Sequence, residues 1–245
     1  MTERLKSRRI AITGAASGIG AATARLFAGE AAAVALLDRD ERVRVIADDI
    51  GGAAIVCDVT DERSVVRAVD AASSALSGLD GLVNAAGIAS TQKIADTELS
   101  HWEKVMAVNL TGPFLLCRAA LPLLARARQG TIVNVASASA LLPSGASAAY
   151  AASKAGLLML TKAIAAEYGP SIRANAVCPG TVDTPMIDGL FARDAALDGK
   201  MKASYALQRM ARPDEIARVI LFLTSDESSI MTGASVAADG GRSYH

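Results

Sequence analysis

The chain has 245 residues, 51% of them hydrophobic, and its 25 Lys and Arg residues balance 25 Asp and Glu residues. A chain of this length and composition can bury a substantial core, which excludes an intrinsically disordered protein. A formal net charge of zero produces no field that would collect nucleic acid or an anionic membrane surface, so we expect neither as a partner.

The three cysteines, Cys57, Cys117 and Cys178, lie far apart in apolar sequence. An odd number of widely spaced thiols is typical of reduced core residues and indicates neither a disulfide framework nor a zinc site, so no metal is expected. The first ten residues are charged and lead directly into a strand-like run, without the apolar stretch of a signal peptide. We therefore expect a cytoplasmic protein.

Short apolar runs alternate with longer amphipathic stretches along the whole chain. The runs that predict strands are Arg9–Thr13, Ala33–Asp38, Ala54–Asp58, Gly81–Asn84, Thr131–Ala136, Ile172–Val177 and Ser235–Ala238. The stretches that predict helices are Gly20–Gly29, Glu62–Leu76, Trp102–Arg126, Tyr150–Tyr168 and Asp214–Thr224. This alternation predicts an α/β protein with a doubly wound parallel sheet of about seven strands and helices on both faces.

No linker or repeat interrupts residues 1–245, so we expect one domain that binds its ligand and carries its site. The longest uncharged run, 129–153, includes Asn134, Pro143 and Gly145 and is interpreted as a strand, a loop and a helix start, not as a membrane span. The strand and helix rhythm stops at 184–208, where apolar and charged residues mix. A segment of this kind predicts a lid over a substrate.

A glycine-rich turn follows the first predicted strand and precedes a helix. The turn contains Gly14, Ser17, Gly18, Ile19 and Gly20, so its spacing is G-x-x-x-G-x-G. Glycines allow the backbone to approach a pyrophosphate, whose charge is met by the free amides at the start of the helix. We interpret the turn as a dinucleotide site, although a plain strand-to-helix turn would use the same residues.

Asp38 closes the second predicted strand, eighteen residues after Gly20. A carboxylate at this position can accept hydrogen bonds from the adenosine ribose and repels a 2′-phosphate, which favours NAD over NADP. Arg39 could hold a phosphate, but position 17 in the glycine turn is serine and not a basic residue. The alternative for Asp38 is an ordinary turn residue at a strand end.

Two further strand ends carry residues that suit a ligand crevice, because a doubly wound sheet binds ligands where its strands end. Asp58 and Val59 end the third strand, and Asp58 is placed to meet the adenine amine. The fourth strand ends in Asn84, Ala85, Ala86 and Gly87, whose backbone leaves room for the cofactor.

Tyr150 and Lys154 are four residues apart in a helix-like run, so their side chains share a face. An ammonium group beside a phenol favours the phenolate and lowers the pKa of the tyrosine, which would make an acid/base catalyst. A packing pair with a solvated amine is the alternative. Ser137 lies thirteen residues before Tyr150, and Ser139 is the competing serine in the same loop.

With these motifs in order, the chain resembles the short-chain dehydrogenase/reductase family, whose members are NAD(P)-dependent oxidoreductases with a Rossmann-type fold. The resemblance covers nearly the whole length and is very specific in its order and spacing. It rests on Thr13–Gly20, Asp58, Asn84–Gly87, Asn109, Ser137, Tyr150 with Lys154, and Pro179-Gly180 followed by Thr184.

By that resemblance, Asn109, Ser137, Tyr150 and Lys154 would form a catalytic tetrad. Tyr150 would exchange the proton of a secondary alcohol, and Lys154 would stabilise the phenolate and bind the nicotinamide ribose. Ser137 would hold the substrate oxygen, and Asn109 would bind a water that links Lys154 to solvent.

The resemblance also implies that Pro179, Gly180, Val182 and Thr184 meet the nicotinamide end of the cofactor, although an ordinary Pro-Gly turn would look the same. The family is commonly tetrameric, so we expect a homotetramer in which the helices carrying Asn109 and Tyr150 pack against partner subunits.

The expected function is hydride transfer between NAD(H) and a secondary alcohol or ketone. One alternative is an NADPH-linked reductase of 3-oxoacyl thioesters, and another is a dinucleotide-binding sensor without catalysis. Apolar residues of 184–208 and of the loop after Ser137 suit an apolar or moderately polar substrate. Arg193, Lys200 and Lys202 could reach an anionic group, but they do not identify the substrate.

Overall fold

The computed structural model describes residues 3–142, 147–187, 199 and 202–243. Its strands form one seven-stranded sheet in the order β3-β2-β1-β4-β5-β6-β7, and every neighbouring pair is parallel. The strands are β1 (Arg9–Thr13), β2 (Ala33–Asp38), β3 (Ala53–Val56), β4 (Gly81–Asn84), β5 (Gly130–Val135), β6 (Ile172–Pro179) and β7 (Ser235–Ala238). This arrangement confirms the predicted doubly wound fold.

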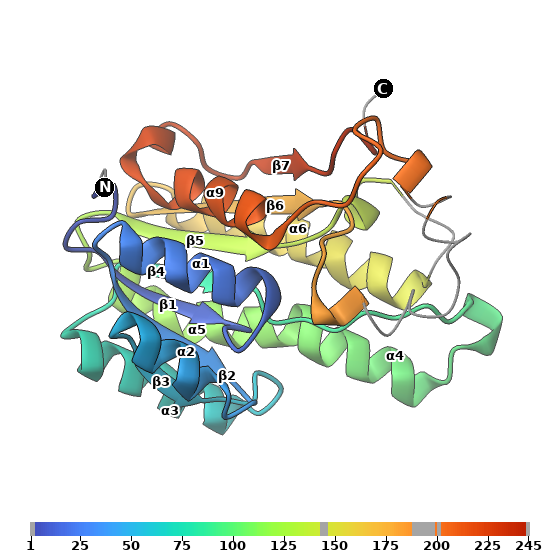
Figure 1. Cartoon of the computed structure of the whole chain (residues 1–245). Helices are drawn as coiled ribbons and strands as arrows, with labels where there is room; N and C mark the ends of the chain where they lie inside the picture. The colour runs from blue at the N-terminus through green and yellow to red at the C-terminus, as the bar shows by residue number, and fades with distance from the viewer. Residues whose placement is uncertain (1–2, 143–146, 188–198, 200–201, 244–245) are drawn as a thin grey trace.

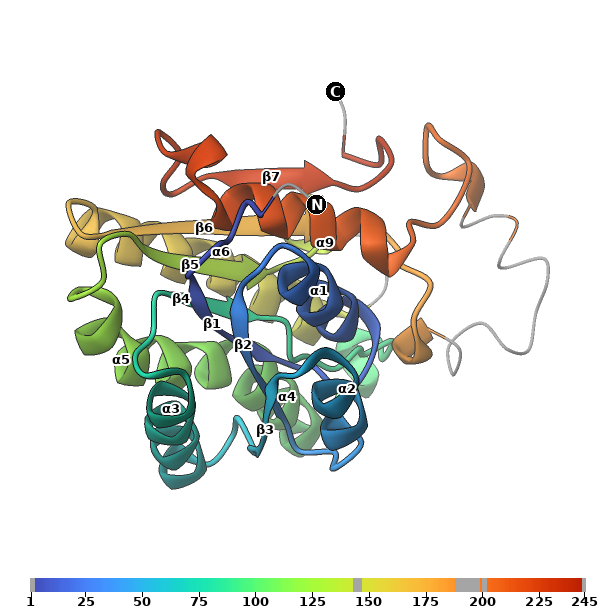
Figure 2. The same ribbon diagram turned by 60° about the vertical axis from the view of Figure 1, so that its left-hand side comes forward.

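Helices cover both faces of the sheet (Figures 1 and 2). They are α1 (Gly18–Gly29), α2 (Val43–Ile50), α3 (Glu62–Leu76), α4 (Leu99–Met106), α5 (Gly112–Leu124), α6 (Ala148–Tyr168) and α9 (Pro213–Thr224). Shorter helical turns are η1 (Ile94–Asp96), η2 (Ala107–Thr111), η3 (Ala138–Ala140) and η4 (Asp226–Ser228). Helices α1, α2 and α9 pack on one face, and α3, α5 and α6 pack on the other.

Alternate strand residues supply the two cores, because successive side chains of a strand point to opposite faces. Ile10 and Ile12 of β1 join the cluster under α1 and α9, while Ala11 joins the cluster under α3 and α5. All three side chains are fully buried. The strand sequences are therefore continuous apolar runs, because a strand that is buried on both faces needs apolar side chains on both faces.

Helix α2 was absent from the sequence-based prediction. Only three of its eight residues, Val43, Ile46 and Ala47, are buried, and it ends at Gly51, which has a φ of 67°. The other five residues are Arg44, Val45, Asp48, Asp49 and Ile50, and a segment of eight residues is too short for a helical apolar pattern to stand out in the sequence. Strand β3 also ends two residues earlier than predicted, at Val56 instead of Asp58.

The helix predicted over Trp102–Arg126 is interrupted. Between α4 and α5 the backbone forms the π-helical turn η2 over Ala107–Thr111, which contains Asn109. The combined segment Leu99–Leu124 is the one described helix that is long and apolar enough to cross a membrane by composition, but half of its apolar window is buried inside the fold. Burial of that kind is typical of a core helix in a soluble protein.

The switch point of the sheet lies between β1 and β4, because the chain leaves β1 toward β2 and β3 and then returns to start β4 beside β1. In open parallel sheets the ligand crevice lies at this point, outside the carboxyl ends of the strands.

Candidate active site

A cavity of about 1030 Å³ opens at the carboxyl ends of the strands. Its lining runs from the turn after β1 to Arg242 beyond β7 and includes residues that follow each of the seven strands. This volume lies at the upper end of the range for small-molecule sites. Most of the residues predicted to bind cofactor or substrate line this one space.

The glycine turn is shaped for close backbone approach. Gly14 and Gly18 have φ values of 68° and 53°, which non-glycine residues rarely adopt. A Cβ at Gly14 would lie 2.7 Å from the Ala86 amide nitrogen, and a Cβ at Gly20 would lie 2.2 Å from the Gly14 carbonyl oxygen. No other residue fits at Gly14 or Gly20 without moving the backbone.

The start of α1 faces the cavity. Ser17 precedes the helix in an extended conformation, and its side chain makes no capping hydrogen bond. Ser17, Gly18, Ile19 and Gly20 all line the cavity. Because the first amides of a helix have no partner within the helix, this turn is suited to hold a pyrophosphate.

Asp38 lies half-buried at the end of β2, and its two oxygens accept hydrogen bonds from the Ala16 and Asp40 amides, each at 3.0 Å. These bonds fix the carboxylate at the cavity wall and leave further lone pairs for a ligand. Arg39 is exposed and also lines the cavity, whereas Arg42 forms an ion pair with Asp40 at 2.6 Å.

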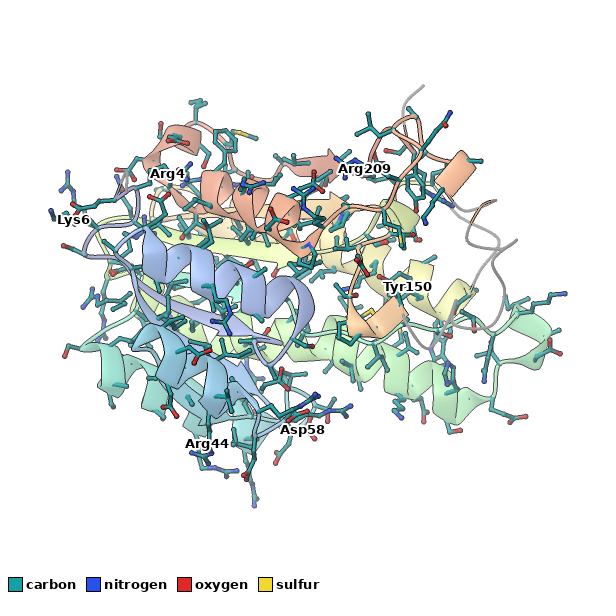
Figure 3. The ribbon with its side chains drawn as sticks, in the orientation of Figure 1. Arg4, Lys6, Arg44, Asp58, Tyr150 and Arg209 are labelled. Atoms are coloured by element: carbon teal, nitrogen blue, oxygen red, sulfur yellow. The ribbon has the colours of Figure 1, made fainter. Side chains whose placement is uncertain are left out.

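Asp58 follows β3 and lines the same cavity together with Val59. One carboxylate oxygen accepts hydrogen bonds from the amide of Thr60 at 2.9 Å and from its hydroxyl at 2.7 Å, and these bonds lower the pKa of Asp58. Figure 3 labels Asp58 below the sheet and Tyr150 on the far side of the glycine turn. Asp58 follows β3 and Tyr150 lies on α6, and both line the cavity.

Asn84 does not line the cavity, unlike Ala85, Ala86 and Gly87. Asn84 is 2% exposed, and its side-chain amide donates hydrogen bonds to the Asn134 side-chain oxygen Oδ1 at 2.8 Å and to the Cys117 sulfur at 3.5 Å. The structure places this amide in the core between β4 and β5. Its contribution to the crevice is to hold the strand ends together, so the direct contact expected from the motif is confined to the backbone that follows it.

Lys154 lies at the centre of the cavity wall although it is only 4% exposed. Its ammonium donates a hydrogen bond to the Val135 carbonyl at 2.8 Å and lies 5.9 Å from the centre of the Tyr150 ring. Burial lowers the pKa of Lys154 to about 8, against an upward influence of Cys178. A lysine of this kind can exchange a proton near neutral pH.

Tyr150 stands one turn before Lys154 on α6, and both side chains line the cavity. Burial raises the pKa of its phenol, and a hydrogen bond with Ser137 opposes the shift. This direction is opposite to the one expected from the Tyr150–Lys154 pair. The reason is that the ammonium bonds to the Val135 carbonyl, so loss of solvation dominates at the phenol.

Ser137 is distinguished from Ser139 by this contact. Ser137 follows β5 in an extended conformation and accepts a hydrogen bond from the Ser139 amide at 3.1 Å. Both serines line the cavity, but only Ser137 is close enough to the phenol to lower the pKa of Tyr150, which favours Ser137 as its partner.

Asn109 is fully buried, and its side chain clamps the loop after β4. The side-chain oxygen of Asn109 accepts a hydrogen bond from the Ile88 backbone amide at 2.9 Å. The side-chain NH2 group donates hydrogen bonds to the Ile88 backbone carbonyl at 3.0 Å and to the Ser153 hydroxyl at 3.2 Å. A Cβ at Gly87 would lie 3.3 Å from the Asn109 oxygen and 3.5 Å from the Lys154 ammonium. Asn109 therefore lies beside Lys154, but its side chain is committed to protein groups.

The loop after β6 closes the far wall. Pro179, Gly180, Val182 and Thr184 all line the cavity, as the motif predicts. A Cβ at Gly18 would lie 3.1 Å from the Thr184 methyl group, so this loop meets the glycine turn. Of the predicted lid, 188–198 and 200–201, with Arg193 and Lys200, lie outside the described residues.

A hydrogen-bonded chain that the sequence reasoning missed joins three elements at the cavity. The Ser147 hydroxyl donates to Ser90 at 2.7 Å, and Ser90 bonds the His101 Nε2 atom at 2.8 Å. Ser147 also accepts from the Tyr150 amide at 3.3 Å and thereby caps α6. Serines are too common in loops for this chain to be visible in the sequence.

Among the described residues, no group of three or more His, Cys, Asp or Glu is placed to hold a metal ion. The described lining supplies hydroxyl groups, carboxylates, the buried ammonium of Lys154 and a space bordered by backbone amides.

Comparison with known proteins gives consistent matches over the whole chain. A family model described as enoyl-(acyl carrier protein) reductase matches residues 14–243. The chain is 40% identical to 2-(S)-hydroxypropyl-CoM dehydrogenase 3 from Xanthobacter autotrophicus, over 98% of both chains. It is 42% identical to cis-4-hydroxycyclohexanecarboxylate dehydrogenase from Sinomonas cyclohexanicum, again over 98% of both.

A third relative is the 3-oxoacyl-acyl-carrier-protein reductase of Thermotoga maritima, with 39% identity over 97% of this chain and 98% of the relative. Among solved structures, the ligand-free aldohexose dehydrogenase of Thermoplasma acidophilum superimposes with a TM-score of 0.92 and 32% identity, over 100% of this chain and 97% of the other.

Proposed function

Because this chain belongs to the short-chain dehydrogenase/reductase family of oxidoreductases, we propose that it transfers a hydride between NAD(H) and a secondary alcohol or ketone. The observation that carries the proposal is the meeting of Tyr150, Lys154 and Ser137 with the glycine turn around one cavity. Residues 1–245 would act as one cofactor-binding and catalytic domain.

The cavity fits a nicotinamide dinucleotide at both ends. Free amides at the start of α1 suit the pyrophosphate, and Asp38 and Asp58 are placed for the ribose and the adenine. Val182 and Thr184 would contact the carboxamide end. When bound, this cofactor supplies or accepts the hydride.

Tyr150 is assigned the proton transfer. In the reductive direction, its phenol donates a proton to the substrate oxygen while the Ser137 hydroxyl stabilises the charge that develops there. A raised pKa keeps the phenol protonated at neutral pH, which suits this direction. In the oxidative direction Tyr150 must first lose its proton, so alkaline conditions favour alcohol oxidation.

Lys154 is assigned two tasks, binding the nicotinamide ribose and exchanging protons with Tyr150. A pKa of about 8 allows the amine to gain and lose a proton in the working range. Asn109 would hold the π-helical turn and the Ile88 backbone beside it, so that a water can link Lys154 to solvent.

NAD is proposed over NADP because Asp38 is a fixed carboxylate at the end of β2, where it would meet the adenosine ribose. The test is a screen of alcohols and ketones with both cofactors, followed by NADH or NADPH absorbance. A clear preference for NADPH would contradict the choice of cofactor.

An NADPH-linked reductase of 3-oxoacyl thioesters is the second candidate, since the Thermotoga maritima relative has that name. Rates with a short 3-oxoacyl thioester, compared with those for simple ketones, separate the two. A non-catalytic dinucleotide sensor is the third, and the assembled Ser137, Tyr150 and Lys154 group argues against it.

A cytoplasmic homotetramer is proposed for the assembly. Exposed apolar side chains on the helices that flank Asn109 and Tyr150 support subunit contacts there, with Leu99 69%, Phe114 42% and Met159 64% exposed. Sedimentation velocity tests it, and a monomer would contradict it.

A further inference from the structure

Charge is distributed unevenly along the cavity. The acidic residues among its described lining are Asp38, Asp40 and Asp58, which end β2 or follow β2 or β3, and the cations Arg39 and Arg42 line the same end. From β4 onward the described lining contains no acidic residue but three cations, Lys104, Lys154 and Arg242. The end of the crevice at which Tyr150 stands is therefore positively charged.

Arg242 is held in place at this end. Its guanidinium donates to the Ser204 hydroxyl at 3.2 Å and lies 5.5 Å from the centre of the Tyr205 ring. Tyr205 is buried, and its hydroxyl bonds the Thr181 amide at 3.0 Å and the Thr181 hydroxyl at 2.7 Å. Arg242 is thus fixed above the loop after β6, which lines the same cavity.

The acidic group nearest to Arg242 in the chain does not neutralise it. Asp239 is 6% exposed, and its carboxylate accepts the amides of Gly241 at 3.0 Å, Arg242 at 3.2 Å and Ser243 at 3.0 Å. Asp239 does not line the main cavity, and no described acidic side chain forms an ion pair with the Arg242 guanidinium.

Lys104 is exposed on α4 at the other side of this space, and it too has no acidic partner among the described residues. The Lys154 ammonium already donates a hydrogen bond to the Val135 carbonyl and lies over the Tyr150 ring. Of the three cations, Arg242 therefore combines a fixed position with a charge that faces the cavity.

We propose that the substrate carries a carboxylate or a similar anionic group remote from its carbinol carbon, and that Arg242 binds this group. A guanidinium presents paired N–H donors that match the two oxygens of a carboxylate. Lys104 adds positive potential at the entrance and speeds the approach of an anion. This inference rests on the proposed function, because it names the substrate class of that same site.

The test measures binding first, so that it does not depend on turnover. Calorimetric titration of the full chain, with and without NADH, compares cyclohexanecarboxylate with its neutral isostere, cyclohexanecarboxamide. We expect the carboxylate to bind at least about 10-fold more tightly, since hydrogen bonds to charged groups are the stronger ones. Arg242→Gln should remove the difference, and Arg242→Lys should retain part of it.

Arg44→Gln is the matched control, because Arg44 is exposed on α2 and outside the cavity lining, so the same charge is lost elsewhere (Figure 3). It should leave both affinities unchanged. Equal affinity of the wild type for the two ligands, or equal weakening of both by Arg242→Gln, would overturn the inference. Thermal melting of each variant identifies a folding defect, and Arg242→Lys then provides the independent comparison.

Kinetics separate this inference from the proposed function. With 4-hydroxycyclohexanecarboxylate and its carboxamide as substrates, Arg242→Gln should raise KM for the acid about 10-fold or more and leave KM for the amide unchanged. Absence of turnover of any alcohol by the wild type would refute the proposed function, whereas preferential carboxylate binding would stand. Turnover without charge discrimination would refute only the inference.

Discussion

The two ends of the crevice are built in different ways. At one end, Gly14, Gly18 and Gly20 form a turn within seven residues after β1, and Asp38 accepts hydrogen bonds from the amides of Asp40 and of Ala16 in that turn. At the other end, Ser137, Tyr150 and Lys154 lie within 18 residues of one another, and Arg242 lies 88 residues beyond Lys154. The first end is formed by the local backbone conformation of one short segment, and the second end forms only when the whole sheet is in place.

The protonation of the two ends differs as well. Asp58 is an exposed carboxylate whose pKa is lowered by hydrogen bonds from Thr60. Lys154 is buried and Tyr150 is half-buried, and the loss of solvation shifts each pKa so that the neutral form of the side chain is favoured. The charged form is thus favoured at Asp58, and the neutral form is favoured at Tyr150 and Lys154.

The largest effect is expected at the proton-transfer end. Replacing Tyr150 by Phe removes the phenol proton while keeping the ring, so kcat should fall about 10³-fold or more. NADH binding, measured by fluorescence titration, should stay within about twofold of the wild type. Turnover retained at one tenth of the wild-type rate would show that Tyr150 is not the acid/base group.

The second effect tests the local turn. Gly20→Ala places a Cβ where the Gly14 carbonyl lies, and should lower stability by about 2–3 kcal/mol and weaken NADH binding. Gly29→Ala is the control in the same helix, since nothing lies within 4 Å of its added Cβ. It should be neutral or stabilising by about 0.5–1 kcal/mol. Equal stability of both variants, measured by urea unfolding, would contradict the turn geometry.

A third effect concerns Lys154, whose pKa is lowered to about 8 by burial. Below pH 8 the amine is protonated in the folded and the unfolded chain, and the cost of burying its charge is fully present. Between pH 8 and pH 10 the folded chain loses this proton while the unfolded chain retains it, so stability rises with pH. The expected gain relative to Lys154→Met is about 2 kcal/mol.

Unfolding free energies of the wild type and Lys154→Met at pH 7, 8, 9 and 10 measure this difference. A difference between the two proteins that is independent of pH would show that Lys154 titrates at its ordinary value. Alcohol oxidation should rise only toward strongly alkaline pH, because burial raises the pKa of the Tyr150 phenol above its ordinary value.

The smallest effect is expected from cofactor choice. Asp38→Asn keeps an acceptor for the ribose but removes the charge that repels a 2′-phosphate, so the ratio of kcat/KM for NAD over NADP should fall about 10-fold. Asp70→Asn, an exposed change on α3 outside the cavity, should leave the ratio unchanged. An unchanged ratio in Asp38→Asn would remove the basis for proposing NAD.

Much of the first end was accessible from the sequence, because its signals are short-range. The positions of Gly14 to Gly20, the strand ending in Asp38 and the parallel alternation were all visible in the residue pattern. Helix α2 was missed because its eight residues are fewer than a helical pattern needs to be recognised. The lid prediction over 184–208 falls largely outside the described residues.

For the second end, the sequence predicted which residues take part but not their protonation or their hydrogen-bond partners. The i, i+4 spacing placed Tyr150 and Lys154 on one face of α6, as the structure has them. The sequence did not predict that the pKa of Tyr150 is raised or that Asn109 hydrogen-bonds the Ile88 backbone. It also did not predict the hydrogen-bonded chain Ser147–Ser90–His101. Each depends on burial or on partners from another element.

The sequence by itself indicated the parallel sheet and most of the residues that border the crevice, because periodicity, glycine turns and short spacings act over one or two turns of chain. The family was identified by the resemblance of the motifs. Only the tertiary structure decided which groups are buried together. It directed the Lys154 ammonium to the Val135 carbonyl, turned Asn84 into the core, and set Arg242 above the loop after β6. Solvation and long-range packing set these outcomes, and neither is encoded in local spacing.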